Sequence, residues 1–200
     1  MNKPFSQSCE NNKEPILSII KEVLCDKKCL LEVGSGTGQH AVYFAPSLPQ
    51  LNWQTSDLSI NHHGINQWID AYPSNNLKRP ILLDLHSNRT NHLSDTIDSI
   101  FTANTLHIIS WPLVKNFFNY VSSTLVTQGV LCIYGPFNYK NKFSSQSNAN
   151  FDVWLKNRDD QSGIRDFEAI ICLANSVNLK LVNDHEMPAN NRLLVFIKES

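Results

Sequence analysis

Apolar residues recur along the chain in five sets that follow the i, i+3, i+4, i+7 spacing of one buried helix face. The first set begins directly after Pro15, a residue that suits the first turn of a helix. The pattern therefore predicts five helices, each with one face on a core. They contain Ile16, Ile19, Ile20 and Val23; Ala41, Phe44, Ala45 and Leu48; Ile65, Trp68, Ile69 and Tyr72; Val114, Phe117, Phe118 and Val121; and Phe167, Ile170, Ile171 and Ala174.

Short apolar runs of strand length lie between these helices, at residues 29–33, 52–55, 81–85, 99–102 and 130–134. Strands that alternate with helices pair in parallel through right-handed crossovers. Two final runs, Leu179–Asp184 and Leu193–Lys198, have only the loop at 187–191 between them, which predicts an antiparallel pair. We expect an α/β fold with a doubly wound, Rossmann-like sheet of about seven strands, mostly parallel with a C-terminal antiparallel hairpin.

The length of 200 residues fits one ordinary domain with a single core. We expect a single domain over residues 1–200, in which residues 1–28 form an N-terminal cap segment and a helix. Residues 138–150 are rich in Asn, Ser and Lys, and the sequence predicts a loop or cap there.

Composition and charge narrow the functional class. A hydrophobic fraction of 42% and a charged fraction of 18% are typical of a soluble globular protein. The chain lacks an apolar run long enough to span a membrane, and its polar start lacks the apolar region of a signal peptide, so we expect a cytoplasmic protein. The net charge is -1 and the 17 basic residues are dispersed, which favours a small-molecule substrate over nucleic acid. Nothing in the pattern specifies an oligomeric state.

The five cysteines form no C-x-x-C pair, so we expect reduced thiols and no metal site. Cys25 and Cys29 are four residues apart, which leaves a metal clip conceivable, but no second pair accompanies them.

A glycine-rich loop follows the first predicted strand and runs directly into a helix. Its glycines are Gly34, Gly36 and Gly38, and such a loop lets a ligand approach the backbone beside a helix N-terminus. A dinucleotide fingerprint would need glycine where Gln39 stands, and a P-loop would need Lys followed by Ser or Thr. NAD is therefore the weaker choice and ATP bound through a P-loop is excluded. The alternative is that the glycines only form tight turns.

The form E-x-G-x-G-x-G, with Glu32 first and Ser35 inside the loop, resembles the first motif of class I methyltransferases. The resemblance implies that S-adenosylmethionine is the cofactor and lies against this loop. It implies further contacts from residues near the ends of the next strands and from the segment before the first helix: Asp57 for the ribose hydroxyls, Asp84 and Leu85 for adenine, Asn104 for the methionine and methyl end, and Asn12 for closing the site. The alternative for Asp84 is a cap or turn residue.

Over nearly its whole length the chain resembles the methyltransferase-like protein 26 family, previously catalogued as a domain of unknown function. The resemblance implies a fold and a cofactor but no settled reaction. The chain departs from the family pattern at Asn11, where arginine is usual, and at residues 158–161, where R-D-P with a tryptophan is usual. The segments that carry the resemblance are residues 10–17, 32–41, 53–57, 103–107, 134–137, 147–152, 163–166 and 187–191.

Candidate catalytic and substrate residues follow the later strands. His107 is the best candidate for a general base, because histidine titrates near neutrality, and its alternative is a packing residue. Tyr134 is a second catalytic candidate. Arg158, Arg165 and Asn190 are candidates for orienting an anionic or polar substrate, since open α/β sheets bind ligands at the carboxyl ends of their strands. The alternative for Arg165 is that it only starts the last helix.

The sequence thus favours an S-adenosylmethionine-dependent methyltransferase that acts on an unidentified small molecule. The alternative from another class is a catalytically silent module that binds the cofactor. A short-chain NAD enzyme is a third, weaker interpretation, because it would need a Tyr-x-x-x-Lys pair, and Tyr120 and Tyr139 are followed four residues later by Thr124 and Phe143.

Overall fold

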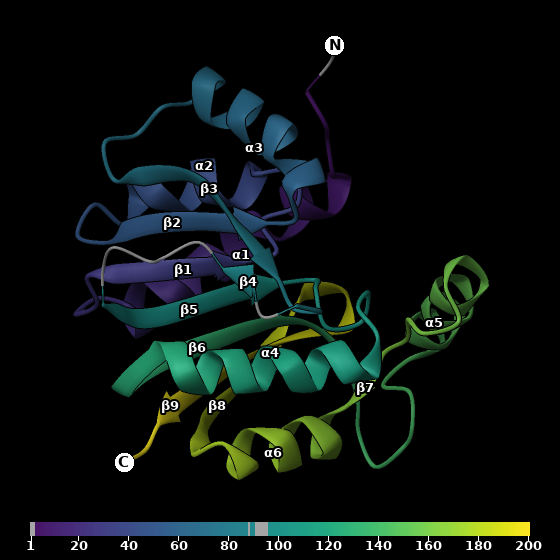
Figure 1. Cartoon of the computed structure of the whole chain (residues 1–200). Helices are drawn as coiled ribbons and strands as arrows, with labels where there is room; N and C mark the ends of the chain where they lie inside the picture. The colour runs from purple at the N-terminus through teal and green to yellow at the C-terminus, as the bar shows by residue number, and fades with distance from the viewer. Residues whose placement is uncertain (1–2, 88, 91–95) are drawn as a thin grey trace. The chain divides into compact units, whose positions relative to one another are not determined.

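The computed structural model describes residues 3–87, 89–90 and 96–200, which form two compact units that divide after Thr102 (Figure 1). Strands alternate with helices as the sequence predicts, and the fold is of the α/β, Rossmann-like class. The seven predicted strands are all present. Two additional strands, β4 (Arg89–Thr90) and β7 (Arg165–Asp166), have two residues each.

The first unit is built on parallel strands in the order β3 (Leu77–Asp84), β2 (Asn52–Asp57), β1 (Cys29–Val33) and β5 (Ile97–Ala103), with β4 antiparallel to β3. Its helices are α1 (Gln7–Val23), α2 (Gln39–Phe44) and α3 (Ser59–Ala71), and a 3-10 turn, η1 (Ala45–Ser47), follows α2. Phe44, Trp53 and Phe101 are fully buried, with ring centroids 5.7 to 5.8 Å apart. This aromatic cluster anchors α2 to the sheet, directly behind the glycine loop.

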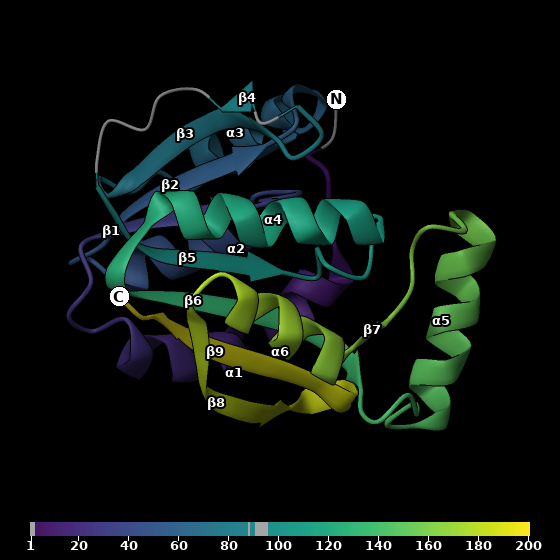
Figure 2. The ribbon, with the colours of Figure 1, turned by 60° about the horizontal axis from the view of Figure 1, so that its bottom comes forward.

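The second unit contains the predicted antiparallel hairpin. Strand β9 (Asn191–Lys198) lies between β6 (Leu125–Asn138) and β8 (Leu179–Met187) and runs antiparallel to both, and β7 pairs in parallel with β6. A 3-10 turn, η2 (Pro188–Asn190), joins β8 to β9. Helices α4 (Trp111–Thr124) and α6 (Phe167–Ser176) lie side by side over these strands, whereas α5 (Gln146–Arg158) stands apart from them (Figures 1 and 2).

Helix α1 begins much earlier than the apolar pattern predicts. It starts at Gln7 with Ser6 as its N-cap, so Pro15 lies inside the helix and not in its first turn. The first half of the helix is held by polar contacts of Glu10 and Asn12 with α2, which leave no apolar periodicity. The prediction of a start after Pro15 was wrong because it relied on periodicity alone.

Helix α5 occupies part of the segment predicted as a loop. Ser145 caps it by accepting a hydrogen bond from the Asn148 amide, and the helix starts at Gln146. Its buried residues, Asn148, Asp152 and Leu155, are mostly polar. A helix held by polar side chains shows no apolar stripe, which is why the sequence pattern missed it.

Candidate functional site

The glycine loop after β1 adopts a backbone that requires its glycines. Gly34, Gly36 and Gly38 all have positive φ, at 74°, 59° and 89°. The amides of Gly34 and Ser35 both donate to the Ser56 carbonyl, at 3.1 and 3.0 Å, which ties the loop to the end of β2. A Cβ placed on Gly36 would find no atom within 4 Å. The loop is therefore fixed at its base and open above Gly36.

Asp57, the last residue of β2, lies against this loop. Its Oδ2 accepts from the Gly36 amide at 2.7 Å, and its Oδ1 accepts from the Leu58 amide and from Asn61 Nδ2, both at 2.7 Å. The structure thus brings together two features that are 21 residues apart in the sequence. Leu58 is 43% exposed beside this carboxylate, and the sequence analysis missed it although it directly follows Asp57.

Glu32 supports the loop from inside the core. Its Oε2 accepts from Trp53 Nε1 at 3.1 Å and from Ser35 Oγ at 2.9 Å. Burial raises the pKa of this carboxyl to about 7, and the negative charge of Asp57 adds to the rise while the two hydrogen bonds oppose it. Glu32 therefore changes its charge near neutral pH in the folded protein.

We expect the difference in unfolding free energy between Glu32→Gln and the wild type to shift in favour of the variant by about 3 kcal/mol between pH 4.5 and pH 8 in the cofactor-free protein. The pKa of Glu32 is higher in the folded chain, at about 7, than the ordinary value of 4.5. The folded state therefore binds this proton more tightly, and the stability owed to it is lost as the pH rises from 4.5 to 7. Glutamine does not titrate, so the variant escapes this loss.

Urea unfolding of both proteins between pH 4.5 and 8 measures the difference, in which the titration of the histidines cancels. The exposed Glu14→Gln is the matched control and should show no such trend. A constant difference between Glu32→Gln and the wild type at every pH would contradict the prediction.

Asp84 ends β3 and serves a local turn. Its Oδ1 accepts from the His86 amide at 2.9 Å and its Oδ2 from Ser87 Oγ at 3.1 Å. The backbone hydrogen bond from His86 is the largest cause that lowers the pKa of this carboxyl. The turn alternative therefore has direct support, and contacts of Asp84 and the half-buried Leu85 with adenine stay predictions.

A polar network joins α1 to the helix that follows the glycine loop. His40 Nε2 lies 2.7 Å from Asn12 Oδ1, and burial lowers the pKa of His40 to about 4, so the neutral ring donates to Asn12 at neutral pH. Gln39 accepts from the Ser6 amide at 2.6 Å and donates to Glu10 Oε1 at 2.6 Å. Gln39 thus fastens the start of α1, a role that the sequence analysis missed.

The segment after β5 carries Asn104 and His107. Asn104 has a left-handed backbone with φ of 56°, and its amide donates to the Tyr134 carbonyl at 2.9 Å. His107 is 5% exposed and packs edge to face on Phe151, with centroids 5.5 Å apart. Burial, and then the positive charge of Arg165, lower the pKa of His107 to about 4. The His107 ring is therefore neutral at neutral pH, and its role as a general base stays a prediction.

Tyr134 and Arg165 are both held within the second unit. Tyr134 lies in β6, in agreement with the strand predicted at 130–134, opposite Leu193 and 3% exposed, and β6 continues beyond it to Asn138, so a catalytic role of Tyr134 stays a prediction. Arg165 donates from Nε to the Leu106 carbonyl at 2.9 Å, and its terminal nitrogen donates to the carbonyls of Ile109 and Gln161. Its guanidinium fixes the backbone around His107, and contact with substrate stays a prediction.

The remaining substrate candidates lie on or beside α5. Arg158 ends this helix, exposed, with its guanidinium 5.7 Å from the Trp154 ring. Asn190 donates from Nδ2 to Ser147 Oγ at 3.3 Å, and its carbonyl accepts from Asn148 Nδ2 at 3.3 Å. The structure therefore joins η2 to the start of α5.

Asp152, which the sequence indicated only as part of the segment 147–152, anchors α5. This carboxylate is 4% exposed, accepts from the Ile164 amide at 2.8 Å and pairs with Lys156 Nζ at 2.7 Å. Among the residues that the structure describes, no three His, Cys, Asp or Glu side chains gather as metal ligands. None of the described helices is both long and apolar enough to span a bilayer.

The fold is similar to that of solved methyltransferases. An O-methyltransferase family protein from Burkholderia thailandensis aligns with a TM-score of 0.78 at 14% identity, over 94% of this chain and 56% of that one. An O-methyltransferase family 2 protein from Planctomyces limnophilus, in complex with apigenin, aligns with a TM-score of 0.72 at 17% identity, over 85% of this chain and 50% of that one. Human N-acetylserotonin methyltransferase in complex with SAM aligns with a TM-score of 0.70 at 11% identity, over 96% of this chain and 58% of that one.

The chain spans about half the length of these proteins, and at such identities the likeness shows the fold alone. A family model matches residues 3–198, almost the whole chain. On that match the chain belongs to the family described as "Protein of unknown function (DUF938)".

Proposed function

We propose that this protein is an S-adenosylmethionine-dependent methyltransferase that acts on a small molecule. The observation that carries the proposal is the geometry where β1 and β2 end: open space over Gly36 and the Asp57 carboxylate on the Gly36 amide. A cofactor without phosphate but with a ribose diol needs backbone that it can approach and a carboxylate that accepts from hydroxyls. The likeness to methyltransferases, one of them in complex with SAM, supports the same cofactor, and the sequence resemblance supports a relationship to the methyltransferase-like protein 26 family.

The residues present fit the cofactor. Within the described part of the chain, Asp57 Oδ2 accepts only from the Gly36 amide and would accept one ribose hydroxyl, and Oδ1 would accept the other in place of Asn61. The exposed part of Leu58 would offer an apolar surface to the adenine ring. Asn12 uses its oxygen for His40, and its Nδ2 has no hydrogen-bond partner among the described residues, so it is free to donate. Gln39 would hold α1 in place over the loop. In this proposal residues 1–200 act as one methyltransferase-like domain with residues 1–28 as its cap.

When bound, S-adenosylmethionine supplies a methyl group on a sulfonium for in-line displacement. The contribution of the chain to such a step is mainly proximity and alignment of the acceptor. His107, with its pKa at about 4, is a weak base at neutral pH, so we propose that its neutral ring accepts a hydrogen bond that orients the acceptor. Tyr134, inside β6, would act on the acceptor only through neighbouring groups.

Calorimetry with S-adenosylmethionine and S-adenosylhomocysteine tests the cofactor, and a screen for methyl transfer to pools of small molecules tests turnover. We expect both molecules to bind one to one and transfer to occur to at least one pool. Binding without any transfer would favour the silent module. Failure of both molecules to bind would remove the proposal.

A further inference from the structure

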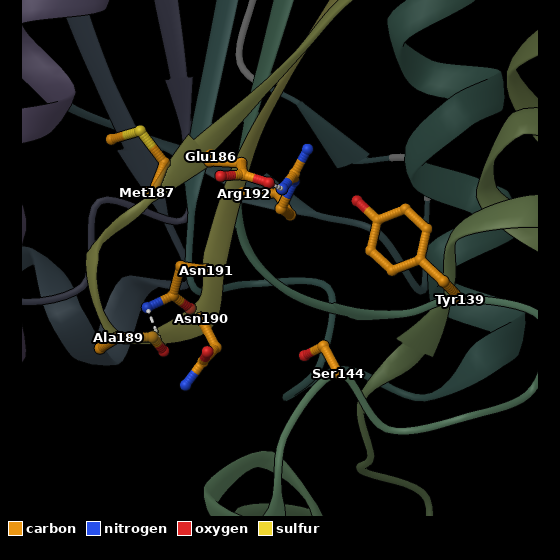
Figure 3. Close-up of a pocket in the computed structure, with 8 residues that line it drawn as sticks. All are labelled: Tyr139, Ser144, Glu186, Met187, Ala189, Asn190, Asn191 and Arg192. Atoms are coloured by element: carbon orange, nitrogen blue, oxygen red, sulfur yellow. Dashed lines mark hydrogen bonds and ion pairs between the residues drawn. The ribbon is translucent and has the colours of Figure 1, made fainter.

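A polar cavity of about 550 Å³ opens in the second unit, where β6 ends and where η2 turns the chain from β8 into β9 (Figure 3). Tyr139 and Ser144 lie on one side of it, and Asn190 and Asn191 lie on the other. The carboxyl ends of strands are where open α/β sheets bind ligands. The cavity has the size of a small-molecule site, and none of the contacts described above for the glycine loop uses it.

The charged side chains beside this cavity form ion pairs with one another. Arg192 donates from Nε to Asp184 Oδ1 at 2.7 Å and lies 3.1 Å from Glu186 Oε1 through its terminal nitrogen. Tyr139 donates its hydroxyl to Asp184 Oδ2 at 2.8 Å, and its ring stacks on Phe167 with centroids 4.8 Å apart. The Tyr139 side chain is therefore fixed in the wall before any ligand arrives.

The turn on the other side is strained. Ala189 (φ 57°, ψ 37°) and Asn190 (φ 58°) are consecutive left-handed residues, and this conformation costs an ordinary residue such as alanine about 1–2 kcal/mol. Such strain persists where the surroundings enforce it, and it gathers at ligand sites. Here the hydrogen bonds of Asn190 to Ser147 and Asn148 enforce it.

The charge balance decides which ligand this cavity can take. Arg192 contributes one positive charge, and its two partners, the lining residue Glu186 and Asp184 behind it, contribute two negative charges, so this group is net negative. Among the described lining residues Arg192 is the one cation, and both carboxylates engage it, so an anion would have to displace them. The other polar groups are neutral and also make internal hydrogen bonds: Ser144 Oγ accepts from Asn148 Nδ2 at 2.8 Å, Asn190 Nδ2 donates to Ser147 Oγ at 3.3 Å, and Asn191 Nδ2 donates to the Pro188 carbonyl at 3.2 Å. Exchanging one of these for a hydrogen bond to a ligand separates no charges. Neutral donors and acceptors on a rigid frame suit hydroxyl groups.

We infer that this cavity binds an uncharged, hydroxyl-rich small molecule. The inference rests on the cavity alone and not on the proposed function. The hydroxyls of the ligand exchange hydrogen bonds with Asn190, Asn191 and Ser144, and the Arg192 ion pairs stay intact.

Nuclear magnetic resonance of the full chain, labelled with ¹⁵N, tests this inference through the side-chain amide signals of Asn190 and Asn191. The probes are glucose, myo-inositol and uridine, which are uncharged, and gluconate, the anionic counterpart of glucose. We expect at least one uncharged probe to shift both signals in a saturable way and gluconate to bind at least fivefold more weakly than glucose. The inference is overturned if no uncharged probe shifts them or if gluconate shifts them as well as glucose.

Asn190→Gly removes the amide and keeps a left-handed backbone, so the turn can still form. With the Asn191 signals as the readout, we expect Asn190→Gly to weaken the binding of the responding probe at least fivefold. Asn178→Gly, at another left-handed position (φ 59°) outside the cavity, is the matched control and should bind as the wild type does. Equal binding by Asn190→Gly and the control would overturn the assignment.

Calorimetry with S-adenosylhomocysteine on the same sample separates this inference from the proposed function. Cofactor binding without any shift at Asn190 and Asn191 removes only the inference. A shift without cofactor binding removes the proposed function and keeps the cavity as a site for an uncharged ligand.

Discussion

Replacing Asp57 by alanine is expected to weaken S-adenosylhomocysteine binding by about 100-fold or more. A hydrogen bond to a charged group contributes about 1.5–3 kcal/mol, and two ribose hydroxyls that share this carboxylate would lose about 3 kcal/mol together. Asp57 also accepts from the Gly36 amide at 2.7 Å, so its removal loosens the loop at the point where the cofactor would approach. Calorimetry on the purified variant gives the affinity directly.

Two further variants make this result specific. Asp57→Asn keeps the shape and one acceptor oxygen, so it should fall between the wild type and Asp57→Ala. Asp70→Asn is the matched control, because Asp70 is exposed and pairs with Arg79 on the surface of the same unit. We expect its affinity to be unchanged. Binding by Asp57→Asn and Asp57→Ala within threefold of the wild type, with intact thermal unfolding, would show that the carboxylate does not hold the cofactor.

Periodicity predicted most of the fold because most of the chain buries one apolar face per element. The seven strands and the helices around Ile65, Phe117 and Ile170 all fill the cores of their units. Where polar side chains hold a helix in place, apolar periodicity did not predict its start or its presence. The first half of α1 is bound to α2 through Gln39 and Asn12, and α5 is bound to the backbone of Ile164 through Asp152. Hydrogen bonds leave no apolar stripe in the sequence.

The candidate site likewise contains residues that the sequence predicts and contacts that it does not. The glycine loop and Asp57 could be predicted, because the loop directly follows β1, Asp57 ends β2, and each residue type suits one chemistry. The contact of Gln39 with Ser6 spans 33 residues and that of Asn148 with Asn190 spans 42, so no local spacing in the sequence indicates either contact. The pKa of His107 depends on its burial beside Arg165, which no sequence pattern contains.

The other large expected effect concerns stability: Gly38→Ala should destabilise the protein by about 2–4 kcal/mol. Gly38 is the N-cap of α2 with φ of 89°, and left-handed backbone alone costs an alanine about 1–2 kcal/mol. Its Cβ would also lie 3.1 Å from Ile65 Cα, a backbone atom that cannot rotate away. Helix α3 would have to shift, which adds the cost of an overpacked core. Urea unfolding measures the loss.

Gly36→Ala is the matched comparison, and the two variants should separate stability from binding. Gly36 has φ of 59° and open space around its Cβ position, so alanine there should cost about 1–2 kcal/mol of stability, the strain of the backbone alone. The same Cβ would occupy the space that the cofactor needs, so this variant should lose S-adenosylhomocysteine binding by at least tenfold while it remains folded. If Gly36→Ala bound the cofactor as the wild type does, the open space over the loop would not be the cofactor site. Equal losses of stability in both variants would mean that the contact with Ile65 relaxes without cost.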